Sequence, residues 1–176
     1  SLTIATTGGT NTISGKVGNS NSLKQATING TGTAAFSSTV NVDDFDLGGA
    51  ATVTFAADVT SANGIDLANN NGTFTFADGA DLTGSISSTG GANGTLNFTG
   101  SSTVTGQVGL AAGTRLAAVN INGADKTVTI TGNSFATAVT TVADSTLDLG
   151  GNLTLTGALT NDGSINVAVG KTLTAV

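Results

Sequence analysis

The chain has 176 residues, of which 9% are charged and 38% are hydrophobic, and its net charge is −6. It has no His, Cys, Met, Trp, Tyr or Pro, and all 11 acidic residues are Asp, which excludes the usual zinc, haem and iron–sulfur sites, disulfides, and a Cys or Ser–His nucleophile. Five basic residues are too few for a nucleic-acid patch, and no segment approaches the roughly 20 apolar residues of a membrane helix. We therefore expect no cofactor, no nucleic-acid partner and no membrane insertion by this segment, which also lacks a signal peptide and is expected to be a mature or excised region.

Residues 1–48 contain apolar residues that show no clear repeat. These residues are Leu2, Ile4, Ile13, Val17, Ile28, Phe36, Val40 and Val42. Their spacing predicts coils that are less regular than those of residues 49–176 but belong to the same domain.

The only acidic cluster of the chain consists of Asp43, Asp44 and Asp46. Three carboxylates within four residues are a candidate Ca²⁺ site, because Ca²⁺ takes hard oxygen ligands. The alternative is a solvated loop. We favour the loop, because the glycine-rich nonapeptide repeat that binds Ca²⁺ in parallel β-rolls is absent.

A short motif recurs from residue 49 onward. It consists of a turn residue, a small residue, Thr or Ser, and then apolar, polar and apolar residues. Copies lie at residues 71–76 (NGTFTF) and 93–98 (NGTLNF), with weaker copies at 51–55, 125–130, 144–149 and 162–167. The last apolar residues follow at intervals of 21, 22, 32, 19 and 18 residues, and they are Phe55, Phe76, Phe98, Ile130, Leu149 and Val167. We expect these six side chains to form one buried stack, with the 32-residue interval a longer coil that carries a loop.

A second motif follows the first at a nearly constant distance. Residues 80–84 (ADLTG) and 102–106 (STVTG) are copies of it, and residues 85–87 and 107–108 could add a third strand to each coil. Asp58 and Asp81 occupy matching positions in adjacent coils, and Thr103 replaces them in the next one. Each coil is therefore predicted to hold two or three short strands.

These repeats predict an all-β fold, a right-handed parallel β-helix with coils of about 18–23 residues that forms one open-ended solenoid over residues 1–176. Alternation places every second side chain inward, and stacking the coils about 4.8 Å apart buries them. The alternative is an antiparallel sandwich with Asn-Gly hairpins. The solenoid is favoured because the motifs repeat in the same chain direction.

Two ligand-directed functions follow from the fold class. Polysaccharide-cleaving enzymes also use parallel β-helices, but they need a proton donor and a partner carboxylate, usually with aromatic platforms. Without Glu, His, Tyr or Trp, we expect no enzyme. Ice-binding solenoids carry ranks of Thr on one flat face. Seven Thr-x-Thr pairs with an apolar centre begin at residues 52, 73, 103, 127, 129, 154 and 172, and this irregular spacing predicts that they scatter over several faces as ordinary outward β residues.

Residues 69–76 (NNNGTFTF) and 94–106 (GTLNFTGSSTVTG) resemble the passenger regions of rickettsial autotransporters, the surface cell antigen family that includes outer membrane proteins A and B. The resemblance covers roughly residues 50–176. It implies type V secretion, a β-helical passenger on the bacterial cell surface, and adhesion to a host cell-surface protein or formation of a surface layer. The family's transmembrane barrel is not in this chain, so a passenger fragment is expected. Self-association through the solenoid ends is a further expectation, and the alternatives are an ice- or glycan-binding surface or a structural spacer.

Overall fold

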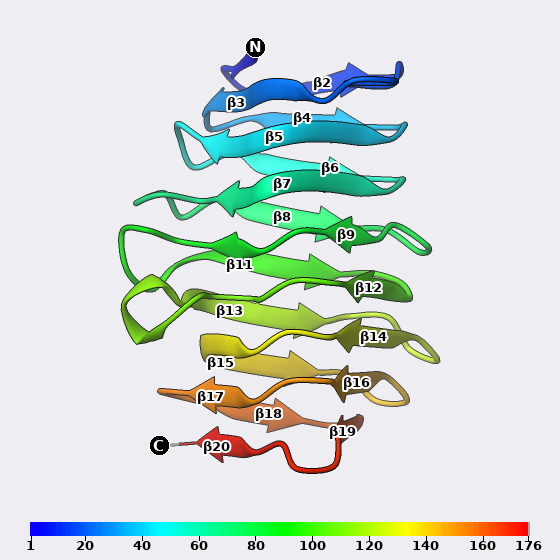
Figure 1. The fold of residues 1–176 in the computed structure, drawn as a ribbon, viewed down its shortest axis with the longest axis vertical. Coiled ribbons are helices and arrows are strands. Elements are labelled where there is room, and N and C mark those ends of the chain that lie inside the picture. The colour runs from blue at the N-terminus through cyan, green and yellow to red at the C-terminus, as the bar shows by residue number, and fades with distance from the viewer. Residues whose placement is uncertain (176) are drawn as a thin grey trace.

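The computed structural model describes residues 1–175 and consists almost entirely of parallel β-strands wound into a right-handed solenoid (Figure 1). The coils lie one above the next along the long axis, with the N-terminus at one end and the C-terminus at the other. Among the described residues the only helix is the 3₁₀ turn η1 (Ala112–Thr114). The predicted parallel β-helix is confirmed, and the antiparallel sandwich is excluded because every pairing of named strands is parallel.

The strands form two long ladders. The first ladder runs, in order of pairing, through β1 (Leu2–Thr6), β3 (Leu23–Gly30), β5 (Val40–Leu47), β7 (Val59–Asp66), β9 (Leu82–Thr83), β12 (Ser102–Val104), β14 (Thr127–Ile130), β16 (Thr146–Leu149) and β19 (Ser164–Val167), with β10 (Ile86–Ser87) also paired to β7. The second runs through β2 (Thr10–Ile13), β4 (Thr33–Phe36), β6 (Thr52–Phe55), β8 (Thr73–Phe76), β11 (Asn93–Phe98), β13 (Leu116–Ile121), β15 (Ser134–Thr141), β17 (Leu153–Leu155) and β20 (Leu173–Ala175), with β18 (Leu159–Asn161) also paired to β15.

The long strands β5, β7 and β15 each bend from one side of the solenoid to the next, so each coil presents three faces. Face A consists of residues 40–42 and 59–61 with β9, β12, β14, β16 and β19. Face B consists of β1, residues 25–30 of β3, residues 44–47 and 64–66, β10, residue 108, residues 134–136, β17 and β20. Face C consists of β2, β4, β6, β8, β11, β13, residues 138–141 and β18. The third strand predicted at residues 85–87 and 107–108 corresponds to β10 and to the bridge that pairs Ile86 with Val108.

Coil lengths extend beyond the predicted 18–23 residues, but no coil of the described residues is as long as the 32-residue interval of the motif, which joins two different faces. Aligned residues are 18 positions apart from Leu149 to Val167 and 26 apart from Ser102 to Val128. The longest coil contains η1, which accommodates the extra residues between faces B and C. The strands of residues 1–48 pair in the same parallel ladders as the rest of the chain, although their sequence repeats poorly.

The inward side chains form one continuous core, which is aromatic in its N-terminal half. Its largest fully buried side chains include six Phe residues, namely Phe36, Phe45, Phe55, Phe74, Phe76 and Phe98. Neighbouring rings in this group lie 5.1–5.9 Å apart between centroids. This is the distance range in which aromatic pairs add stability beyond the area that they bury.

The predicted stack of six residues divides into two columns on different faces. Phe55, Phe76 and Phe98 are aligned on face C, and they are buried. The residue that follows Phe98 in this column is Ile121, not Ile130. The prediction of a single stack is therefore wrong beyond Phe98, because the same alternating motif occurs on two faces.

The second column lies on face A and contains Ile130, Leu149 and Val167 in register. Ile130 and Leu149 are buried. Val167 remains 37% exposed because β19 is the last strand of its ladder and no further coil in the described chain covers it. Its assignment to the buried core is corrected accordingly.

Glycines line the corner between faces A and B, where successive coils approach closely. A Cβ atom added to Gly106 would lie 2.2 Å from the carbonyl oxygen of Gly84, and one added to Gly132 would lie 2.4 Å from the carbonyl oxygen of Gly106. A Cβ on Gly151 would in turn lie 2.3 Å from the carbonyl oxygen of Gly132. The backbone of each coil therefore occupies the space that a side chain on the next coil would need.

Candidate functional site

A groove on face B, which we call the acidic groove, is lined by side chains from neighbouring coils. It has a volume of about 280 Å³, and its lining includes Asp44, Asp46, Asp66, Ser87 and Leu110. It lies beside a register shift in the pairing of β5 with β7. Leu110 is 45% exposed, so the groove combines hydrogen-bond acceptors with an apolar contact, as ligand sites commonly do.

Hydrogen bonds already position two of these carboxylates. Asp66 accepts the Thr89 amide at 3.0 Å through Oδ1 and the Thr89 hydroxyl at 2.8 Å through Oδ2. Asp46 accepts a 2.7 Å hydrogen bond from Nε2 of Gln25. The carboxylates are thus held in place by side chains and backbone of neighbouring coils.

The candidate Ca²⁺ site is not supported by the positions of its three residues. The Asp43 carboxylate accepts a 2.5 Å hydrogen bond from the Ser22 hydroxyl, Asp46 is bound to Gln25 as above, and the register shift lies between Val42 and Asp44. Among residues 1–175 no group of three or more acidic side chains could hold a metal ion. Asp44 and Asp46 both line the acidic groove, whereas Asp43 is not part of its lining and is bound to Ser22 beside the register shift.

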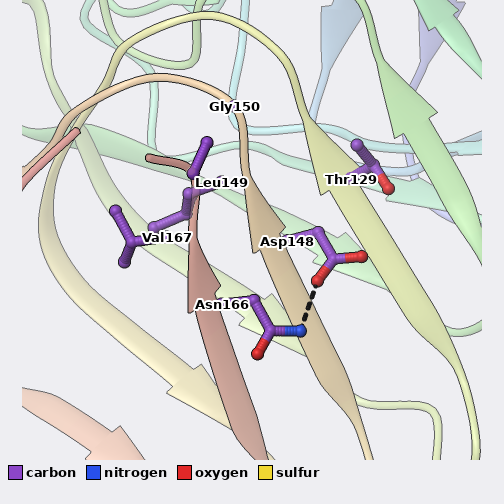
Figure 2. A pocket seen from close by; sticks show the side chains of 7 residues that line it. Thr129, Asp148, Leu149, Gly150, Asn166 and Val167 are labelled. Carbon is purple, nitrogen blue, oxygen red and sulfur yellow. Dashed lines mark hydrogen bonds between the residues drawn. The ribbon is translucent and has the colours of Figure 1, made fainter. Parts of the chain in front are cut away.

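A second hollow, shown in Figure 2, lies on face A at the C-terminal end of the solenoid. It has a volume of about 310 Å³, and Leu149 and Val167 contribute apolar surface to it. At its edge Nδ2 of Asn166 donates a 2.7 Å hydrogen bond to Asp148. Asp148 is the only carboxylate that lines this hollow, which gives no second acid group for acid–base chemistry. The hollow is the uncovered end of the hydrophobic core.

Asp side chains at the corners and edges connect one coil to the next. Asp58 accepts the backbone amide of Asp81 at 3.1 Å, and Asp81 accepts the amide of Thr103 at 2.7 Å. The predicted alignment of these three positions is confirmed by the pairing of Val59 with Leu82 and of Leu82 with Val104. Their role in the structure is to satisfy backbone amides of the following coil.

Asp78 makes the same contact and adds a charge. Its Oδ1 accepts the Ser101 amide at 2.8 Å, and its Oδ2 lies 2.9 Å from Nζ of Lys126, two coils away. The hydrogen bond from Lys126, followed by that from Ser101, lowers the pKa of Asp78 below its ordinary value. Both side chains are solvent-accessible, so this ion pair contributes little to stability.

The outward positions of face C form two aligned columns, which we call the threonine face. The first column contains Thr10, Thr33, Thr52, Thr73, Thr95, Ala118 and Ala138. The second contains Thr12, Ala35, Thr54, Thr75, Asn97, Asn120, Thr140 and Thr160. Every one of these positions is Thr, Ala or Asn.

The predicted scatter of the seven Thr-x-Thr pairs is confirmed, since they lie on all three faces. The Thr-x-Thr pairs do not reveal the aligned column on face C. The residue two positions after Thr33 is Ala35, and the residue two positions after Thr95 is Asn97, so neither Thr begins a Thr-x-Thr pair. Thr10 and Thr12 do form such a pair, but the residue between them, Asn11, is not apolar. A count of Thr at each outward position of one face would have found the column, but the faces cannot be assigned before the register is known.

No protein-family model matches this chain, no curated protein is significantly similar to it, and no solved structure matches it significantly. No helix within residues 1–175 is long and apolar enough to cross a membrane. The functional assignment therefore depends on the chain's own sequence and geometry.

Proposed function

We propose that this chain is a non-catalytic passenger segment of a bacterial autotransporter, displayed on the outside of the outer membrane, where it serves host-cell adhesion or surface-layer formation. The observation that carries the proposal is the unbroken parallel solenoid, whose side faces present mostly neutral polar side chains. The resemblance of residues 50–176 to rickettsial passengers supports the same conclusion.

The solenoid suits display because it is long and continuously paired. The first ladder contains nine strands in sequence, and a spacing of about 4.8 Å per strand gives a rod roughly 40 Å long. Each coil contacts mainly the coils next to it, so additional coils lengthen the rod without changing its cross-section. Such a rod holds its side faces, or another part of the same protein, away from the membrane.

The acidic groove is the part of the side faces that best suits a protein partner. Leu110 supplies exposed apolar surface, while Asp44, Asp46 and Asp66 supply acceptors that fit Lys, Arg or hydroxyl groups of a host cell-surface protein. Binding is expected to be weak at each contact and to depend on multivalent display.

Beads coated with the chain are expected to bind host cells more than beads coated with a variant whose outward residues are shuffled. Binding is expected to survive EDTA, because residues 1–175 contain no group of three or more acidic side chains that could hold a metal ion. It is expected to weaken as salt is raised, because salt screens the three carboxylates of the groove. Leu110→Asp is expected to lower the number of bound beads at least twofold.

The matched control for this experiment is Thr83→Asp, which places the same charge on the exposed surface of face A. Equal binding by coated and shuffled beads would contradict the adhesive role and leave the spacer role. Equal loss with both Asp variants would show that the groove is not the contact surface.

A further inference from the structure

We infer that the threonine face is an ice-binding surface, whose ligand is the ordered water of an ice plane. This inference concerns face C and is independent of the adhesive role that we propose for face B. It rests on three observations, which are the alignment of the face, its neutrality and its free hydroxyl groups.

The alignment extends over successive coils without interruption. Thr10, Thr33, Thr52, Thr73 and Thr95 are paired in register on five consecutive strands, and no register shift occurs between them. Neighbouring strands are about 4.8 Å apart, and alternate residues of a parallel strand are about 6.6 Å apart. Outward groups at these positions form two parallel rows, and the spacing along each row is close to an oxygen repeat of hexagonal ice.

The face carries no charge, in contrast to the other two. Face A has Asp148 at an outward position and Asp81 at its edge, and face B has Asp44, Asp46 and Asp66. A charged group orients the surrounding water around itself, which disturbs an ice-like arrangement. A neutral surface of methyl and hydroxyl groups matches an uncharged lattice, so the charge distribution favours ice on face C over a charged macromolecule.

The hydroxyl groups of the threonine face are available for water. None of its ten Thr hydroxyls makes a hydrogen bond to the protein within the described residues, although other Thr side chains do. The Thr105 and Thr131 hydroxyls, at the corner that follows β12 and β14, donate instead to the carbonyls of Leu82 and Val104. Thr is also β-branched and has few rotamers, which lowers the entropy cost of holding ordered water.

The test measures ice shaping and thermal hysteresis of the 176-residue chain at micromolar concentration. We expect faceted ice crystals and a measurable freezing hysteresis. Thr73→Tyr, at the centre of the first column, is expected to reduce the hysteresis at least twofold, because the ring interrupts the row. Thr52→Tyr on the preceding coil is expected to do the same.

Thr103→Tyr is the matched control, because it changes the same residue type at an outward strand position of face A. It is expected to leave the hysteresis unchanged. Far-UV circular dichroism of every variant checks that the substitution has not changed the fold. Round, unshaped crystals with the unsubstituted chain would overturn the inference, as would an equal loss with Thr103→Tyr. Neither result depends on host cells, so failure here is distinct from failure of the adhesion assay.

Discussion

Replacing Phe55 with Ala is expected to lower the free energy of unfolding by about 3–5 kcal/mol. The Phe55 ring is buried, and its centroid lies 5.4 Å from that of Phe36, 5.6 Å from Phe45, 5.8 Å from Phe74 and 5.1 Å from Phe76. Removing it leaves a cavity between consecutive coils and ends four aromatic contacts. Urea unfolding followed by far-UV circular dichroism measures the change.

The control for this substitution is Thr54→Ala, one residue away on the same strand. Thr54 points outward on face C, so its removal is expected to cost less than about 1 kcal/mol, as surface substitutions on strands usually do. Equal losses at the two positions would mean that the inward and outward assignment of β6 is wrong.

The second large effect is expected at the glycine corner. Gly106→Ala places a Cβ atom 2.2 Å from the carbonyl oxygen of Gly84 and 2.4 Å from its carbonyl carbon. These atoms belong to the backbone of the neighbouring coil, so the coils must separate locally. We expect a loss of about 2–3 kcal/mol in the free energy of unfolding, as for other overpacked sites.

Gly15→Ala serves as the matched control, because a Cβ atom at Gly15 would meet nothing within 4 Å. Its effect is expected to stay within about 0.5 kcal/mol. If Gly106→Ala were as stable as Gly15→Ala by the same urea unfolding measurement, the coils would be farther apart at this corner than the structure has them.

The architecture could be predicted from the sequence where two features agree, namely strict alternation and repetition in one chain direction. Residues 73–76 and 95–98 show both, and β8 and β11 pair there in register. The third strand at β10 could be predicted as well, because an apolar residue recurs at Ile86 and Val108. In each case the local pattern and the coil spacing indicate the same strand.

The register beyond Phe98 could not be predicted, because the motif is not specific to one face. Residues 125–130 repeat the pattern of residues 93–98, yet β14 lies on face A and β11 lies on face C. Any strand with a buried side alternates apolar and polar residues, so the motif identifies a strand but not its position in the coil. The true successor of β11 is β13, whose Leu116, Val119 and Ile121 point inward.

The surfaces depend on this register even more than the core does. The threonine face combines residues that are 19–23 positions apart, and the acidic groove brings Asp66 beside Ser87 through the pairing of β7 with β10. Neither is visible as a local motif. The contacts by which Asp58, Asp78 and Asp81 connect neighbouring coils could likewise not be predicted from the sequence. Each carboxylate accepts a hydrogen bond from a backbone amide that is 22 or 23 residues away.

The central claim is that these faces are formed by parallel coils in the register described here. It can be tested by pyrene excimer fluorescence, since the chain has no Cys and only introduced thiols will be labelled. In the structure Asn97 and Asn120 are paired, and Nδ2 of Asn120 donates a 2.8 Å hydrogen bond to Asn97. Pyrene on Asn97→Cys and Asn120→Cys is therefore predicted to give strong excimer emission at dilute protein concentration. The pair Asn97→Cys and Thr129→Cys, which the motif repeat would align, is predicted to give monomer emission only. Excimer emission from the second pair and not from the first would contradict the three-faced solenoid.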